Sequence, residues 1–202
     1  MRVPHTLVAL FTLAVSVIVL TALFPAVLLA APQVATPAGS LFENSLIADS
    51  SFEGATSAKL PSGWRTPYPD VVGVWNSDKD ALHGLKSIRI KSTTSAKSAS
   101  RRIVALTPGK RYLCSVNVKV KGGQGRAAIT VRGAESKSSL GVKHVRPTHE
   151  TWQKLVFDFV AKSDKAILFL AASGTAGPTF FDLIKLADAD TTMGSGLSLI
   201  HI

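Results

Sequence analysis

Cysteine is scarce in this sequence. Cys114 is the single cysteine among 202 residues, so the chain cannot form an intramolecular disulfide, and an apolar core has to stabilise the fold unaided. Cys114 alternates in one row with Tyr112, Val116 and Val118. This pattern predicts a buried structural cysteine, because a nucleophilic thiol needs a polarising neighbour.

The motifs of common enzymes are also absent. The sequence contains no GxSxG, no phosphate-binding loop and no CxxC, and its five histidines show no metal-ligand spacing. His144 and His149 lie together in a Pro-containing stretch, away from the other three. A hydrolase of this size would normally show such a cluster, so we expect no enzymatic activity.

Helical periodicity is missing after residue 40. Short runs with alternating apolar residues recur instead, separated by turn pairs such as Pro108-Gly109 and Gly122-Gly123. This pattern predicts an all-β fold, a two-layer antiparallel β-sandwich. The expected strands cover residues 71–75, 86–92, 100–106, 111–120, 126–133, 152–161, 165–172 and 179–186.

Alternation within these strands assigns side chains to the core. Leu155, Phe157 and Phe159 share one face of their strand, which is therefore expected to be buried. In the following strand, Ile167 and Phe169 are assigned to the core in the same way.

The longest apolar run lies at the N-terminus. No residue from Leu7 to Ala31 is charged, and roughly 20 helical residues cross the hydrocarbon of a bilayer. We therefore expect one hydrophobic helix before the sandwich. It is either an uncleaved signal anchor, slightly favoured by its length, or a cleaved signal peptide. Both place the domain outside the cytoplasm, membrane-anchored or secreted.

The expected organisation has four parts. Residues 1–31 form the anchor or signal peptide, 32–43 a linker, 44–187 the sandwich, and 188–202 a linker and tail. The final LSLIHI fits neither linker nor sandwich, and its back-translation resembles the end of a common transposon-based sequencing adapter. We expect the tail to be an artefact of a truncated gene; a short genuine apolar tail is the alternative.

Positive charge dominates the expected soluble part. After residue 40, 22 Lys and Arg face 13 Asp and Glu, a net charge near +9. An acidic polysaccharide is one partner that this charge would suit. Most basic residues, however, alternate with apolar ones along strands, as they do on solvated faces. No basic stripe is interleaved with aromatic residues, so nucleic acid is not expected.

Six segments occur in a characteristic order between residues 44 and 186. They are NSLIADSSFEG (44–54), Gly63-Trp64, GLKSI (84–88), LTPGKRY (106–112), WQK (152–154) and FFDLIKL (180–186). In this order they resemble the jelly-roll carbohydrate-binding modules of the xylan- and glucan-binding type (families 4, 9 and 22, galactose-binding-like). The resemblance implies a non-catalytic, monomeric sugar-binding domain, with the first segment as the opening strand.

The resemblance also implies a structural Ca²⁺ near the two chain ends of the fold. Glu53 and Asp182 lie in mainly apolar segments there, and carboxylate oxygens suit Ca²⁺. The alternative is that both carboxylates accept backbone N–H bonds without a metal. A catalytic pair is not expected, since glycosidase carboxylates flank an open cleft.

Four residues are candidates for sugar binding. Tyr68, between two prolines in a loop, and Trp75, at the end of a strand, could stack on a pyranose. Asn117 and Arg132 lie on the faces opposite the core rows of their strands and could hydrogen-bond hydroxyls. Trp75 could instead belong to the core, and Asn117 and Arg132 could merely face water. Trp64 is expected to be a core lid.

Two functions therefore remain open. The first is a carbohydrate-binding module of a longer surface or secreted protein, and the second is a structural or adhesion spacer that binds no sugar. The first requires an exposed ring in a sheet or cleft. The second predicts that all three tryptophans are buried.

We predict that deleting Leu197 to Ile202 leaves the free energy of unfolding unchanged within about 0.5 kcal/mol, as for residues away from any packed feature. Urea denaturation of the full chain and the shortened chain measures the difference. A larger loss would mean that the tail packs on the domain.

Overall fold

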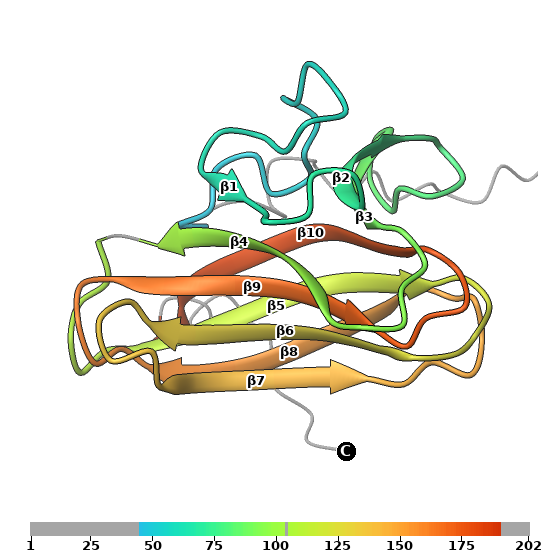
Figure 1. The fold of residues 1–202 in the computed structure, drawn as a ribbon. Helices are drawn as coiled ribbons and strands as arrows, with labels where there is room; N and C mark the ends of the chain where they lie inside the picture. Colours follow the sequence, from blue (N-terminus) through green and yellow to red (C-terminus); the bar gives the residue numbers. More distant parts are fainter. Residues whose placement is uncertain (1–44, 104, 191–202) are drawn as a thin grey trace, which may run out of the picture. The chain divides into compact units, whose positions relative to one another are not determined.

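The computed structural model describes residues 45–103 and 105–190, and within them it shows two five-stranded antiparallel sheets facing each other (Figure 1). Sheet A has the strand order β1-β4-β9-β6-β7, and sheet B has the order β2-β3-β10-β5-β8. The predicted two-layer antiparallel sandwich is confirmed. The strands are β1 (Trp64–Arg65), β2 (Val72–Asn76), β3 (Lys86–Ile90), β4 (Lys97–Ile103), β5 (Arg111–Val120), β6 (Arg126–Gly133), β7 (Ser139–Val145), β8 (Gln153–Val160), β9 (Ala166–Ser173) and β10 (Thr179–Asp188).

The strand assignment differs from the prediction in several places. The two-residue β1 was not predicted, and β4 covers Lys97–Ile103 rather than 100–106. β7 was not predicted either, because this edge strand is mostly exposed and shows no regular apolar alternation. The expected opening strand in 44–54 is wrong: residues 46–51 and 53–54 are turns and bends. Leu46 N–H instead donates to Leu186 O (2.7 Å), and Ile184 N–H donates to Ser50 O (3.0 Å). The segment therefore follows β10 without continuous pairing.

The core lies between the inner faces of the sheets. Cys114 is fully buried in the row predicted for it, and burial raises the pKa of its thiol, so it is an inert core residue. Trp64 is buried and meets Phe52 edge-on, with ring centroids 5.7 Å apart. In β8, Leu155 and Phe159 are buried as predicted.

The prediction for β9 was wrong in its phase. Leu168 and Leu170 are fully buried, whereas Ile167 and Phe169 lie on the outer face and are partly exposed. Both rows of this strand are apolar, so alternation alone could not choose between them. The larger Phe169 was assigned to the core, but the register beside Ile129 and Val131 of β6 directs the leucines inward.

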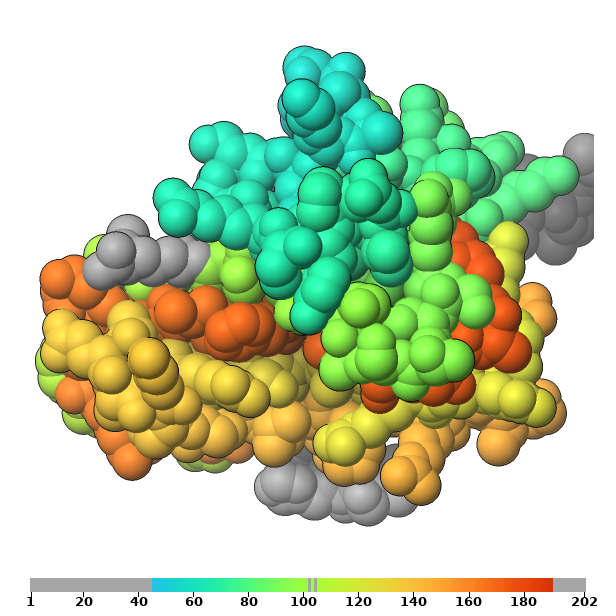
Figure 2. All heavy atoms as spheres, viewed as in Figure 1, coloured from blue at the N-terminus to red at the C-terminus, as the bar shows by residue number. Residues whose placement is uncertain are grey.

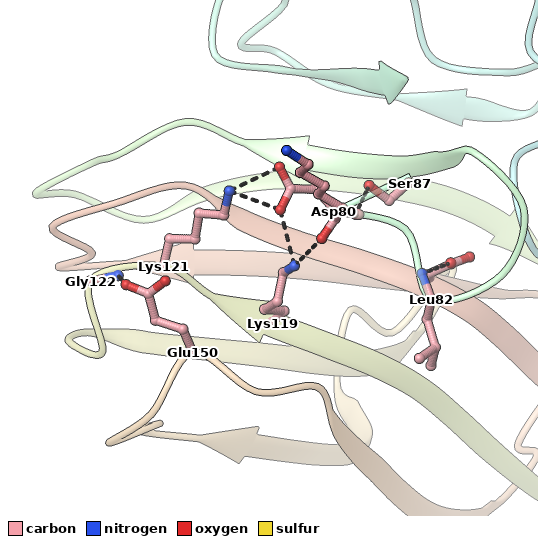
Figure 3. A network of polar contacts seen from close by, with 9 residues as sticks. Asp80, Leu82, Ser87, Lys119, Lys121, Gly122 and Glu150 are labelled. Atoms are coloured by element: carbon pink, nitrogen blue, oxygen red, sulfur yellow. Dashed lines mark hydrogen bonds and ion pairs between the residues drawn. The ribbon is translucent and has the colours of Figure 1, made fainter. Parts of the chain in front are cut away.

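The outer face of sheet B is partly covered by the segment between β2 and β3. Asp80, in this segment, is buried and lies 3.0 Å from Nζ of Lys119, in β5, and 2.8 Å from Nζ of Lys121, just after β5 (Figure 3). Lys119 Nζ also donates to Lys79 O (2.6 Å), and Ser87 Oγ donates to Asp80 O (2.8 Å). These contacts fasten the segment across the sheet.

The N-terminal segment and the tail lie outside the described residues. The expected helix in 1–31, the linker 32–43 and the tail from 191 onward therefore remain predictions. Between residues 45 and 188 the described chain contains no helix. In the part of the chain that the structure describes, no helix is long and apolar enough to cross a bilayer.

We predict that Asp80→Asn destabilises the domain by about 3 kcal/mol, because it leaves the charge of Lys119 buried without its partner. Asp158→Asn is the matched control. Asp158 pairs with Arg111 at 2.7 Å, but both side chains are about half exposed, so this loss should stay below about 1 kcal/mol. Equal losses in urea denaturation would contradict the assigned role.

The pH dependence has a defined sign. Burial raises the pKa of Asp80, but the hydrogen bonds and charges of Lys121 and Lys119 outweigh it, so the pKa lies below its usual value. Its contribution to stability is therefore complete above about pH 4 and is lost as the pH falls further. In Asp80→Asn, the free energy of unfolding, measured by urea denaturation as a function of pH, should therefore fall less below about pH 4 than in the wild type.

Candidate functional site

The outer face of sheet A carries a row of side chains that crosses all five strands. Strand pairing aligns Arg65, Ser100, Phe169, Thr130 and Val142 from β1 to β7. Directly paired residues share a face, and every member of the row is at least partly exposed. This face is turned to the viewer in Figures 1 and 2, bordered by the loops after residue 45.

A hollow of about 460 Å³ lies at one end of this row. Ser100 and Ile167 line it from the sheet, Arg65 lines it from β1, and Glu135 lines it from the β6–β7 connection. Gly63 and Ala134 complete the lining. The hollow therefore combines an apolar side chain with a guanidinium, a hydroxyl and a carboxylate.

Phe169 and Arg132 lie beside this hollow. Arg132 pairs with Ile167, two residues before Phe169 on β9. The Arg132 guanidinium carbon lies 5.3 Å from the centroid of the Phe169 ring, within the range of a cation–π contact. Arg132 is exposed and Phe169 is partly exposed. The contact orients a planar donor group at the edge of an apolar platform.

This arrangement has the chemistry of a sugar platform. An aromatic ring can cover the C–H face of a pyranose, while guanidinium, hydroxyl and carboxylate groups meet its hydroxyls in fixed directions. Glu135 is the one carboxylate among the described residues lining the hollow, whereas glycosidases use a facing pair.

The structure does not bring the four sequence candidates together. Arg132 lies on the outer face of sheet A, whereas Trp75 and Asn117 lie on the outer face of sheet B. Trp75 on β2 and Asn117 on β5 are three strand spacings apart, about 14 Å. The two outer faces are on opposite sides of the sandwich, so these residues cannot contact one sugar.

Tyr68 is less exposed than its loop position suggested. Its ring packs partly against the core, and Lys97 Nζ lies 4.2 Å from the ring centroid. The N–H groups of Val71 and Val72 both donate to Tyr68 O. This turn holds Tyr68 and its flanking prolines against the sandwich.

Trp75 is covered on one face. The Arg89 guanidinium carbon lies 3.7 Å from the centroid of a Trp75 ring. Trp75 also lines a shallow hollow of about 630 Å³ together with Glu53, Asn76 and Lys86. Its indole N–H is buried without an acceptor among the described residues. A sugar could reach the ring only from the side opposite Arg89.

The three tryptophans differ in burial. Trp64 is buried, but Trp75 and Trp152 are partly exposed. Phe169 is a partly exposed ring on the outer face of sheet A, and the sequence analysis had placed it in the core. The signal that could have found it is the double apolar row of β9, since a strand with one solvated face alternates with polar residues.

Glu53 and Asp182 both accept backbone N–H bonds. Glu53 Oε1 accepts from Leu85 N–H (3.0 Å) and Lys86 N–H (2.7 Å). Asp182 Oδ2 accepts from Leu82 N–H (2.8 Å) and His83 N–H (2.9 Å). The two carboxylates thus hold opposite ends of the short segment that leads into β3.

This geometry fits the hydrogen-bonding alternative better than a Ca²⁺ site. Asp182 Oδ1 also accepts from Leu183 N–H (2.7 Å), so N–H donors already face both oxygens. No group of three metal-ligating side chains occurs in residues 45–103 and 105–190, whereas Ca²⁺ takes six to eight oxygen ligands. Of the two alternatives for Glu53 and Asp182, we therefore expect backbone hydrogen bonding without a metal; the Ca²⁺ alternative is tested with a chelator below.

Asp182 is fully buried. Burial raises the pKa of its carboxyl to about 6, against the opposing effect of the His83, Leu82 and Leu183 N–H bonds. Asp182 lies next to Phe181 in β10, the central strand of sheet B between β3 and β5. Backbone N–H donors therefore enclose this carboxylate, which does not face solvent.

Comparison with known proteins identifies the fold. No family model matches the chain, and no curated protein matches it significantly. Among solved structures it is similar to TmCBM61 in complex with β-1,4-galactotriose, with a TM-score of 0.57 and 16% identity over 71% of this chain and 98% of that one. The jelly-roll fold of carbohydrate-binding modules is therefore present.

Two further solved structures share this fold. One is the C-terminal family 22 carbohydrate-binding module of Clostridium thermocellum Xyn10B, with a TM-score of 0.53 and 21% identity, covering 70% of this chain and 93% of that one. The other is the K1 cleaved adhesin domain of Lys-gingipain from Porphyromonas gingivalis W83, with a TM-score of 0.52 and 14% identity, covering 68% and 95%. The sandwich thus occurs in sugar-binding and adhesin domains.

We predict that a chelator leaves the melting temperature unchanged, whereas Asp182→Asn lowers the stability by about 2 kcal/mol. An amide keeps the shape of the carboxylate but turns an NH₂ toward at least one buried N–H donor. Thermal unfolding with and without EDTA measures the first effect, and urea denaturation the second. A drop in melting temperature with EDTA would instead support Ca²⁺ at this site.

Proposed function

We propose that this chain is a non-catalytic carbohydrate-binding module that binds a polysaccharide across the outer face of sheet A. The single observation that carries the proposal is the partly exposed Phe169 ring, with the Arg132 guanidinium 5.3 Å from its centroid, beside a hollow of about 460 Å³. The shared fold with sugar-binding modules supports it.

The row across the sheet suits an extended ligand. Neighbouring strands lie about 4.8 Å apart, so the five aligned residues from Arg65 to Val142 span about 19 Å, enough for several sugar units. Phe169 occupies the middle of this row, with Ser100 and Thr130 as its hydroxyl-bearing neighbours. A polysaccharide chain would therefore lie across the strands, stacked at its centre.

The proposed ligand is a β-linked plant or bacterial polysaccharide. Arg65 and Arg132 flank the platform, and Glu135 lines the hollow. The net charge near +9 after residue 40 also favours acidic polymers. We propose that the domain acts as a monomer outside the cytoplasm, membrane-anchored or secreted, within a longer surface or secreted protein.

A structural or adhesion spacer is the second candidate. The likeness to an adhesin domain of Lys-gingipain favours it. Such a domain would use the same core and would make no specific contact with sugar. The test therefore has to separate stacking on Phe169 from the mere presence of the fold.

The test is affinity electrophoresis and calorimetry with xylan, β-1,4-galactan, β-glucan, pectin, alginate and teichoic acid. We predict that Phe169→Ala weakens binding at least tenfold, about 1.4 kcal/mol, because the stacking ring is lost. Trp75→Ala, on the opposite outer face, is the control and should bind within twofold of wild type. Melting temperatures confirm that both variants fold.

Three outcomes would contradict the proposal. Loss of binding in Trp75→Ala but not in Phe169→Ala would move the site to sheet B. Binding that disappears with salt and survives Phe169→Ala would show charge attraction instead of stacking. No binding to any polymer would support the spacer.

A further inference from the structure

A second hollow lies behind β1. β1 is two residues long and pairs with β4, with Trp64 opposite Arg101 and Arg65 opposite Ser100. Arg65 and Ser100 line the hollow on the outer face of sheet A. Arg101, one residue along, faces the other side and lines a separate hollow of about 550 Å³. The two hollows are thus separated by β1 and share no lining residue.

Arg101 has no partner for its guanidinium among the described residues. It is half-buried, and within residues 45–103 and 105–190 its side chain makes no hydrogen bond or ion pair. Burial lowers the pKa of Arg101, and the nearby charge of Asp49 raises it. None of its nitrogens is a buried atom without a partner, so its N–H donors are open to water or to a ligand in the hollow.

Gly63 keeps this guanidinium accessible. A Cβ on Gly63 would lie 3.6 Å from the Arg101 guanidinium carbon, in direct contact with it, and Gly63 has a φ of +84°. The residue thus turns the chain into β1 and also leaves one side of the guanidinium without a covering side chain.

Asp49 supplies an acceptor in the same hollow. Its Oδ1 accepts from Gly54 N–H at 3.1 Å. Its Oδ2 accepts no hydrogen bond from any described residue. Asp49 and Arg101 do not form an ion pair within 4 Å, so both remain available. The hydroxyls of Thr56, Ser57 and Ser62 also line the hollow.

The chemistry of this set points to one class of ligand. A guanidinium binds a carboxylate through two parallel hydrogen bonds, and a carboxylate such as Asp49 accepts hydroxyl protons. Lys59 and Arg101 against Asp49 give the lining a charge of about +1, which matches a monoanion. A compact ligand with one carboxylate and several hydroxyls satisfies all these groups.

We propose that this hollow binds the uronic acid unit of an acidic glycan, with Arg101 holding its carboxylate and Asp49 accepting its hydroxyls. The site is distinct from the Phe169 platform and does not depend on binding there. A glycan with uronic acid branches would engage both sides of β1 at once.

The experiment uses sodium D-glucuronate as the probe, with D-glucose and sodium acetate as matched ligands. Binding to the folded protein is followed by NMR chemical shifts, including the Arg101 side-chain N–H signal. We expect saturable binding of glucuronate and at least tenfold weaker binding of glucose and acetate. Arg101→Gln should weaken glucuronate binding at least tenfold, and Arg126→Gln, an exposed arginine on β6, should leave it unchanged.

Two further variants keep the test decisive. Ser62→Trp fills the hollow and leaves Arg101 intact, so it should also abolish glucuronate binding if Arg101→Gln fails to fold. Phe169→Ala should leave glucuronate binding unchanged, which separates this site from the polysaccharide platform. Equal binding of acetate, equal binding of glucose, or glucuronate binding that survives both Arg101→Gln and Ser62→Trp would overturn the assignment.

Discussion

The apolar layer between the two sheets is the interaction on which the other features depend. No disulfide can reinforce it, because Cys114 is the single cysteine and is itself part of the layer. Phe181, Leu168 and Ile129 are completely buried in it. Successive side chains of a strand point to opposite faces, so the burial of one row decides what the other row presents to solvent.

β9 shows this consequence most directly. Burial of Leu168 and Leu170 leaves Ile167 and Phe169 on the outside. An apolar outer row is unfavourable in water unless neighbours or a ligand cover it. The proposed platform therefore follows from the same register that completes the core, and the Arg132 guanidinium shields only part of the ring.

The two outer faces differ because different connections cross them. On sheet B, the segment that carries Asp80 lies over β10 and β5 and is held by Lys119 and Lys121. A buried ion pair of this kind adds little net stability, but it is costly to break. On sheet A no comparable ion pair occurs among the described residues.

The short strand β1 separates two hollows of different chemistry. It contributes only Trp64 and Arg65 to sheet A. The hollow lined by Arg65 lies on one side of it, and the hollow lined by Arg101 lies on the other. Trp64 anchors it in the core against Phe52, which fixes Arg65 on one side and leaves Arg101 on the other. At the β1 edge of sheet A, the proposed branched acidic glycan would therefore meet the N–H donors of Arg65 on one side and those of Arg101 on the other.

The sequence by itself determined the fold class, most strands and the core rows with a polar opposite face, such as Cys114, Val116 and Val118. Alternation decides these because only one phase of the strand is apolar. It also identified Arg132 as an outward-facing group. Its resemblance to sugar-binding jelly rolls agrees with the fold of solved modules.

Only the tertiary structure decided which of these residues lie together. The sequence could not show that Trp75 and Arg132 lie on opposite faces, since strand order depends on pairing between distant segments. It could not choose the inner row of β9, where both phases are apolar. It also could not place Asp49 and Arg101 at one hollow, because they are brought together by contacts between segments some 50 residues apart. Local pattern specifies faces, whereas long-range packing specifies sites.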